Sequence, residues 1–120
     1  MNGLSFVADT NFLINVHEGN PITESFLDTV PIVSVISEIE LLGWHKLSAI
    51  EKKKLAALLN DCIIMQLTPE IKNIAIEFKQ QNAIKTPDAI IAATAKFLQL
   101  PLVTSDKGFR KFTDIQIILI

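Results

Sequence analysis

The chain has 120 residues, of which 49% are hydrophobic, so it is long enough to bury the core of one compact domain spanning residues 1–120. Its formal net charge of −2 and its pI of about 5.6 exclude a protein that grips nucleic acid through a strongly basic surface. Cys62 is the only cysteine, so no internal disulfide forms, and we expect a reduced, cytoplasmic setting.

The hydropathy of the chain indicates a protein that is not inserted in a membrane but is covered by another chain. The opening MNGLSFVADT lacks a basic stretch followed by a long apolar core, and no run approaches the roughly 18 apolar residues of a membrane helix. Mean hydropathy is nevertheless +0.38, which is high for a soluble domain of this size. We therefore expect a homodimer, a partner protein, or both, to cover apolar surface.

Short turn signals separate the predicted strands and helices. In the first half, they are a buried strand at 3–8 (GLSFVA), a helix from about Thr10 to Glu18, a short helix near 22–28, a brief strand at 32–33, a helix from Ser34 to about Leu47, and a helix from the capping box at Ser48 to about Asn60. In the second half, they are a strand at 62–66, two helices that begin at the Thr-Pro-acid patterns of Thr68 and Thr86, with the second ending near Gln99, and strands at 101–104 and 116–119.

This alternation of strands and helices is typical of an α/β domain with an open, mostly parallel sheet and helices on both faces. In such sheets, ligands bind outside the carboxyl ends of the strands. Asp9 follows the first predicted strand, and Asp106 follows the strand at 101–104, so their side chains are placed to meet across neighbouring strand ends. Each of them also fits a simple helix N-cap, and that alternative stays open.

Two further acids lie on predicted helices. At about 100° per residue, Glu40 shares a face with Ile36 and Leu47, whereas the competing acid Glu38 lies on the opposite side. An acid inside an apolar stripe is expensive unless a cation or hydrogen-bond donors meet it. Asp88 opens the helix that begins at Thr86, where the helix dipole alone would also favour an acid.

A cluster of four carboxylates predicts a divalent metal ion. Without a cation the acids would repel one another, and some would stay protonated at neutral pH. The predicted ligands are all oxygen atoms, and no histidine or thiolate lies at ligand spacing, which favours Mg²⁺ or Mn²⁺ over zinc. His17 and His45 are isolated in the sequence and are assigned no role.

Four segments of the chain resemble the PIN-domain family of metal-dependent ribonucleases, and within it the small VapC-like toxins of bacterial toxin–antitoxin pairs. In chain order, the segments are VADTNFLI at 7–14, VSVISEIELLG at 33–43, TPDAIIAATA at 86–95 and PLVTSDKGF at 101–109. They occur in the order and at the spacing of that family, and the match covers nearly the whole chain. The chain departs from the pattern at Gly108, where many relatives carry another acid, so the second metal position is in question.

The resemblance implies a three-layer α/β/α sandwich around a parallel sheet of four or five strands, and it implies hydrolysis of RNA phosphodiester bonds. The implied catalytic and metal-binding residues are Asp9, Glu40, Asp88 and Asp106. Asn11 and Thr104 are implied as supporting polar groups beside them. The implied partners are RNA, a small antitoxin protein and a second copy of the chain.

RNA would approach through local positive charge, because the chain as a whole is acidic. Lys107, Arg110 and Lys111 follow Asp106 directly and are the predicted substrate-binding residues, and Lys85 and Lys46 are weaker candidates. The chain has no Tyr and a single arginine, so stacking and bidentate base recognition are weakly provided. Phe109 is expected in the core.

Three other functions are weighed against this interpretation. A phosphatase of the haloacid-dehalogenase type needs a second aspartate two residues after the first, where this chain has Asn11. A binding module that keeps the fold without catalysis is a second alternative. A DNA-directed nuclease on the same scaffold is the third.

Overall fold

The computed structural model describes residues 5–120, so residues 3 and 4 of the first predicted strand lie outside the described part. Five short parallel strands form one sheet in the order β3-β2-β1-β4-β5. The strands are β1 (Val7–Ala8), β2 (Ile32–Ser34), β3 (Ile63–Met65), β4 (Leu102–Thr104) and β5 (Ile117–Leu119). This arrangement confirms the predicted α/β class and its parallel sheet, here with five strands.

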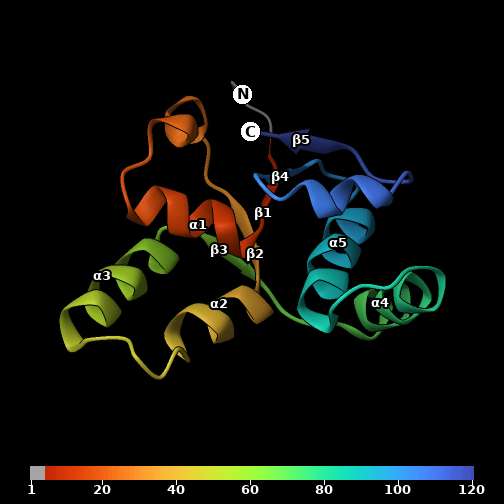
Figure 1. Cartoon of the computed structure of the whole chain (residues 1–120), viewed down its shortest axis with the longest axis horizontal. Helices are drawn as coiled ribbons and strands as arrows, with labels where there is room; N and C mark the ends of the chain where they lie inside the picture. The colour runs from red at the N-terminus through yellow and green to blue at the C-terminus, as the bar shows by residue number, and fades with distance from the viewer. Residues whose placement is uncertain (1–4) are drawn as a thin grey trace.

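Helices connect the strands and cover both faces of the sheet (Figure 1). The α-helices are α1 (Thr10–His17), α2 (Val35–Leu42), α3 (Ala49–Asn60), α4 (Pro69–Gln81) and α5 (Thr86–Leu98), and the 3-10 helices are η1 (Pro21–Phe26) and η2 (Lys107–Lys111). Side chains of Ser34, Ser48 and Thr68 accept backbone hydrogen bonds at the starts of α2, α3 and α4, which confirms three predicted helix starts. No helix within residues 5–120 has the length and apolar character needed to span a bilayer.

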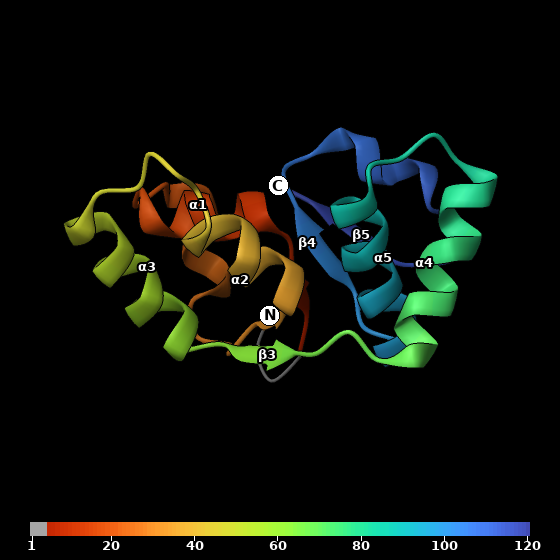
Figure 2. The same ribbon diagram turned by 90° about the horizontal axis from the view of Figure 1, so that it is seen from below.

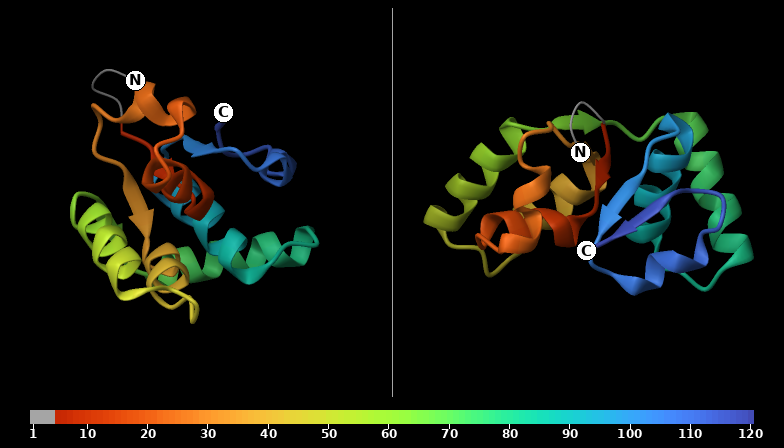
Figure 3. Two further views of the ribbon diagram at one scale, coloured as in Figure 1. Left: turned by 60° about the vertical axis from the view of Figure 1, so that its left-hand side comes forward. Right: turned by 90° about the horizontal axis from the view of Figure 1, so that it is seen from above.

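Two hydrophobic cores lie on opposite faces of the sheet because successive strand residues point to opposite sides. Val7 and Leu102 face a core built with α4, α5 and η2, whereas Ala8 and Val103 face a core built with α1, η1 and α3. Figures 2 and 3 show the two groups of helices separated by the sheet. The predicted three-layer α/β/α arrangement is confirmed.

Helix α5 is the most deeply buried of the helices that the structure describes. Every residue from Ala89 to Ala95 is buried, and most of these side chains are small. Small side chains let α5 approach both the sheet and α4, with which it packs extensively. The helix ends at Leu98, and the next residue, Gln99, has a φ of 55° in the left-handed region that glycine usually occupies. The expected position of Phe109 in the core is confirmed, because its side chain is buried against this layer.

Some predicted element boundaries were wrong. Helix α2 ends at Leu42 with Gly43 as its C-cap, so Leu47 lies beyond the helix and shares no helical face with Glu40. The short helix predicted near 22–28 is the 3-10 helix η1, whose N-cap is Asn20. Helix α5 begins at Thr86, so the residue at its N-cap is Lys85, which provides no side-chain cap.

Candidate active site

The strand order places a topological switch point between β1 and β4. From β1 the chain proceeds to β2 and β3 on one side, whereas β4 and β5 extend the sheet on the other side. Ligands of open α/β sheets bind at the carboxyl ends of the strands beside such a point. Asp9 comes directly after β1, and Asp106 follows β4 after one intervening residue. The fold therefore delivers both predicted acids to the expected place.

A single buried hydroxyl connects these two acids. Thr104 Oγ1 donates a hydrogen bond to Asp9 Oδ2 at 2.5 Å and accepts one from the Asp106 backbone N–H at 2.9 Å. Thr104 is fully buried and Asp9 is 2% exposed, so water competes little with either bond. Thr104 thus fixes the position of the Asp9 carboxylate relative to the backbone at Asp106.

Both acids also act as N-caps, as the simpler alternative expected. Asp9 Oδ1 accepts the Phe12 N–H at 2.8 Å, and Asp106 Oδ1 accepts the Gly108 N–H at 2.8 Å. Capping occupies one lone pair of each oxygen and leaves others available. The two roles are therefore compatible, since the cap orients the carboxylate that stands at the switch point.

The surroundings of Asp9 disfavour the ionised form of its carboxyl group. Burial raises the pKa of Asp9 from 3.8 to about 6, although the hydrogen bonds from Thr104 and the Phe12 N–H lower it. The nearby negative charges of Asp106 and Asp88 raise the pKa further. A bound cation would reverse this effect by favouring the ionised form.

Glu40 is hydrogen-bonded to the hydroxyl of Thr10, the residue next to Asp9, and it is more exposed than the sequence predicted. The Thr10 hydroxyl lies 2.8 Å from Glu40 Oε1 and 2.8 Å from Ser37 Oγ. Because Thr10 has one hydroxyl proton, it can donate to the carboxylate while it accepts from Ser37. Glu40 is exposed, so the expectation of an acid inside an apolar stripe was wrong: α2 turns this side of its surface towards solvent. The alternative acid Glu38 lines a separate hollow with α3.

Asp88 completes the set from the first turn of α5. Burial, together with the charges of Asp106 and Glu40, raises the pKa of Asp88, while Lys85 and Lys111 lower it. Asp88 and Asp106 also line one pocket of about 260 Å³. The charges of Asp106 and Asp88 act on Asp9, and those of Asp106 and Glu40 act on Asp88, so the four predicted acids lie close to one another.

The donor set fits a hard divalent cation only with the help of water. Carboxylate oxygens are the ligands that Mg²⁺ and Mn²⁺ prefer, and Mg²⁺ normally keeps several of its waters. Within residues 5–120, no three histidine, cysteine or acidic side chains are grouped so that they could hold one metal ion directly. The residues therefore suit an ion held by one or two carboxylates, with the remaining acids reached through water.

The model of the PIN domain family matches residues 6–115. The chain belongs to the PIN domain family. Curated proteins give no match to this PIN domain.

Solved structures resemble this PIN domain over almost its whole length. A chain of a toxin–antitoxin complex from Klebsiella pneumoniae has 25% identity and a TM-score of 0.80, and the match covers 94% of this chain and 95% of that one. VapBC2 from Rickettsia felis, bound to a DNA fragment from its promoter, has 17% identity, a TM-score of 0.85 and coverage of 98% and 99%. DNA-bound VapBC from Salmonella typhimurium has 22% identity, a TM-score of 0.79 and coverage of 96% and 97%.

The other predicted residues of the PIN domain occupy different places around the acids. Asn11 is exposed in α1, and within residues 5–120 its side chain forms no hydrogen bond. Of the predicted basic residues, Lys111 lines the pocket of Asp88, whereas Lys107 and Arg110 are exposed on η2 outside its lining. Lys85, a weaker candidate in the sequence, lines the same pocket.

Sequence reasoning gave no role to Thr10 or Ser37. The position of Thr10 directly after Asp9 could have indicated its role. The residue that follows an acid at the end of a strand begins the next helix and therefore lies beside that acid. Ser37 gave no comparable signal, because its contact with Thr10 depends on how α2 packs against α1.

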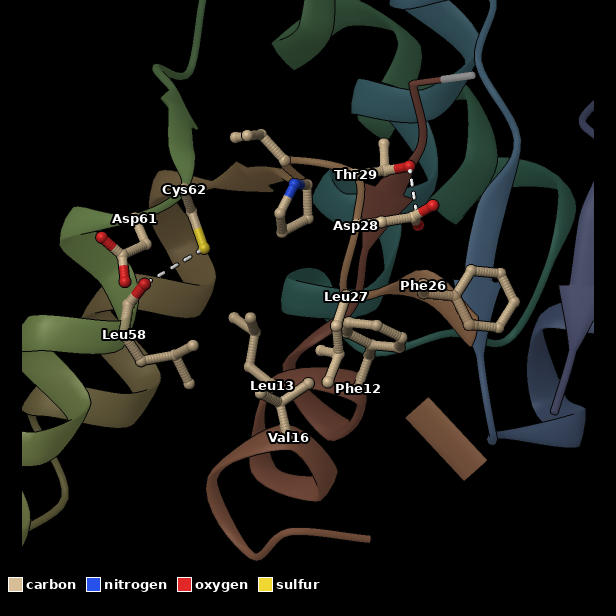
Figure 4. Close-up of a pocket in the computed structure, with 12 residues that line it drawn as sticks. Phe12, Leu13, Val16, Phe26, Leu27, Asp28, Thr29, Leu58, Asp61 and Cys62 are labelled. Carbon is tan, nitrogen blue, oxygen red and sulfur yellow. Dashed lines mark hydrogen bonds between the residues drawn. The ribbon is translucent and has the colours of Figure 1, made fainter. Parts of the chain in front are cut away.

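Two of the larger hollows differ in their relation to the acidic site, since one shares Thr10 and Glu40 with it and the other lies apart from it. A groove of about 530 Å³ runs between α1, α2 and α3 and is lined by Thr10, Ile14, His17, Glu18, Glu40, Leu41, Trp44, Leu47, Glu51 and Leu55. A pocket of about 420 Å³ lies where β2 and β3 begin, at the opposite edge of the sheet from the acids (Figure 4). There the half-buried Cys62 thiol donates to the Leu58 carbonyl oxygen. Burial raises the pKa of Cys62 to about 11, so its reactive thiolate form is rare at neutral pH.

Proposed function

We propose that this PIN domain is a Mg²⁺- or Mn²⁺-dependent endoribonuclease and the toxin of a toxin–antitoxin pair. The observation that carries the proposal is the buried Asp9, which Thr104 links to Asp106 at the switch point of the sheet. Burial of an acid with a raised pKa costs stability, and a cation at this place offsets the cost. The solved toxin–antitoxin complexes that resemble the chain support the toxin assignment.

In this proposal all four acids take part in binding metal. Asp9 and Asp106 would hold an ion directly, while Glu40 and Asp88 would hold a further ion or the waters around it. When bound, the metal lowers the pKa of a water, so that hydroxide is available at neutral pH, and it neutralises charge on the phosphate oxygens.

The chain's own contribution is positioning. Thr104 fixes Asp9, the cap to the Gly108 N–H orients Asp106, and Thr10 orients Glu40. No serine or cysteine nucleophile is needed, because water attacks the phosphorus, and the products are a 5′-phosphate and a 3′-hydroxyl.

The proposed antitoxin would occupy the groove between α1, α2 and α3. Ile14 is 37% exposed there and Trp44 is 56% exposed, so the groove presents apolar surface that lacks a cover within residues 5–120. Glu40 lies in the lining of the same groove. A bound segment would therefore cover apolar side chains and one of the catalytic acids together, which accounts for inhibition by simple occlusion.

We also propose a homodimer in the cytoplasm. Exposed apolar side chains outside the groove include Ile63 at 55% and Ile76 at 48%, which are available to a second copy of the chain. The single free thiol of Cys62 suits a reducing compartment.

The test is a cleavage assay with purified protein and labelled RNA, in EDTA and with added Mg²⁺ or Mn²⁺. The proposal expects cleavage only with metal, 5′-phosphate products, and loss of at least 100-fold in rate for Asp9→Asn, because a metal ligand is removed (an order-of-magnitude expectation). Asp28→Asn, which removes an exposed carboxylate, is the matched control and should cleave as the wild type does.

Two outcomes would favour the alternatives. Cleavage of DNA but not RNA under the same conditions would indicate a DNA-directed nuclease. Binding of Mn²⁺ without cleavage of either, with Asp9→Asn indistinguishable from the wild type, would indicate a binding module and overturn the enzymatic proposal.

A further inference from the structure

The pocket beside Asp88 contains as many positive as negative side chains. Its lining consists of Ala83, Ile84, Lys85, Asp88, Asp106, Gly108, Phe109 and Lys111. Two lysines and two aspartates make the lining formally neutral, although both aspartates belong to the proposed metal site. A site that only bound metal would gain nothing from lysines, because positive side chains repel a cation.

The positions of the two lysines are set by the loop between α4 and α5 and by η2. Lys85 is the N-cap residue of α5, and Lys111 is the last residue of η2. Lys111 Nζ donates to the Ala83 carbonyl oxygen at 3.1 Å, which ties η2 to the loop that carries Lys85. An ammonium group has three donors, so two of the Lys111 donors remain for a ligand.

Neither lysine is neutralised by a salt bridge. Within residues 5–120, the ion pairs are those of His17 with Glu51 and of Lys96 with Asp114, so both lysines of the pocket lack one. The Lys85 side chain also forms no hydrogen bond in this part of the chain, and it is exposed. Both ammonium groups lie near enough to Asp88 to lower its pKa, so their charge is felt inside the pocket.

We propose that Lys85 and Lys111 form a phosphate-binding pair that holds the backbone of single-stranded RNA beside Asp88 and Asp106. This inference rests on the proposed ribonuclease function. With one divalent cation in place the lining carries two surplus positive charges, which attract a phosphodiester; without the lysines it would carry none. The cavity of about 260 Å³ is smaller than the roughly 300–1,000 Å³ of pockets for drug-sized ligands, so it suits a phosphodiester unit.

Gly108 affects both the charge and the space of the pocket lining. A Cβ atom at this position would lie 3.1 Å from Asp106 Oδ1, and an acid would add a negative charge to the lining. The glycine therefore leaves both space and surplus positive charge for a phosphate group. The inference also replaces part of the predicted basic group, because Lys107 and Arg110 lie outside the pocket lining.

The test is equilibrium binding of a fluorescently labelled single-stranded RNA with a phosphorothioate backbone, measured by anisotropy with Mg²⁺ present. The cation supplies the surplus positive charge of the lining, and the substituted backbone resists cleavage during the measurement. The variants are Lys85→Gln, Lys111→Gln and the charge-retaining Lys85→Arg. Each Gln variant should weaken binding about fivefold at 0.1 M salt and reduce the slope of log K against log [salt] by about 0.7, as one lost phosphate contact requires. Lys85→Arg should keep both the affinity and the slope.

Matched variants separate the pocket from general basicity. Lys52→Gln removes an exposed lysine of α3 and should bind as the wild type does. Lys107→Gln and Arg110→Gln should lose less affinity than Lys85→Gln. In metal-activated cleavage, Lys85→Gln should raise KM with little change in kcat, because it removes binding that is equal in the ground and transition states.

The outcomes distinguish the inference from the function on which it rests. If the wild type cleaves RNA but Lys85→Gln matches it in affinity and salt slope, the phosphate-binding pair is refuted and the ribonuclease stands. If Lys107→Gln or Arg110→Gln loses more affinity than both pocket variants, the phosphate site lies on η2 instead. A wild type that neither binds nor cleaves RNA refutes both.

Discussion

Replacement of Asp9 by asparagine should stabilise the metal-free protein above pH 6. The carboxyl is 2% exposed, and its pKa rises from 3.8 to about 6 on folding. Well below pH 3.8 it is protonated in both the folded and the unfolded chain, so its burial carries no charge penalty. Between pH 3.8 and about 6 the unfolded chain loses this proton while the folded chain keeps it, so the stability falls, and above pH 6 the lost stability stays constant.

The expected gain in unfolding free energy follows from the shift in the pKa of Asp9. A difference of about 2 pKa units at about 1.36 kcal/mol each corresponds to about 3 kcal/mol of lost stability, fully present above pH 6. Asparagine has the shape of the protonated acid and is an equally good N-cap for α1. Its amide can donate to Thr104 Oγ1, so the contact with β4 is kept.

The assay is urea unfolding followed by circular dichroism in EDTA at a series of pH values. Between pH 4 and pH 8, the unfolding free energy of Asp9→Asn should rise relative to that of the wild type by about 2.5 kcal/mol, because part of the penalty is already present at pH 4. Asp28→Asn removes an exposed carboxylate and should follow the wild type across the range. An Asp9→Asn variant that is equally or more destabilised at pH 8 than at pH 4 would refute the reasoning.

Three further predictions concern single side chains. Thr10→Val should lower the unfolding free energy by about 1 kcal/mol in denaturant titrations and slow metal-dependent cleavage, because Glu40 loses its hydroxyl partner; a full rate would contradict this role for Thr10. Trp44→Ala should weaken antitoxin binding in calorimetry while the melting temperature stays unchanged, since Trp44 is 56% exposed; unchanged affinity would place the antitoxin elsewhere. Gln99→Gly should raise the unfolding free energy by about 1 kcal/mol, because Gln99 is exposed with a left-handed backbone, and a loss of stability would argue against strain at this helix end.

The fold was predictable from the sequence because its signals are local. Cap residues such as Ser48 and Thr68 start helices by accepting backbone N–H groups, and the apolar residues of α5 report its burial directly. The acids Asp9 and Asp106 were also predictable, since a residue just after a parallel strand lies at the ligand edge of the sheet. Their convergence also requires β1 and β4 to be neighbours in the sheet, and the alternation of strands and helices alone does not predict that strand order.

What could not be predicted depends on contacts between distant segments. Helix α2 ends at Leu42, so Glu40 and Leu47 do not share the helical face that the sequence predicted. Glu40 is exposed instead of lying in an apolar stripe. Its partner Thr10 is thirty positions away, and nothing in the local pattern pairs them. Likewise, Lys85 reaches the pocket of Asp106 because η2 folds back onto the α4–α5 loop through Lys111.

The hydrogen bond between Thr104 and Asp9 joins residues 95 positions apart, which sets the order of events during translation. A ribosome must add β4 before Thr104 and Asp106 exist, and the neighbouring strand β5 that pairs with β4 comes later still. A nascent chain that ends before β4 therefore carries Asp9 without its hydrogen-bond partner. The acidic centre can assemble only after β4 and β5 have been synthesised.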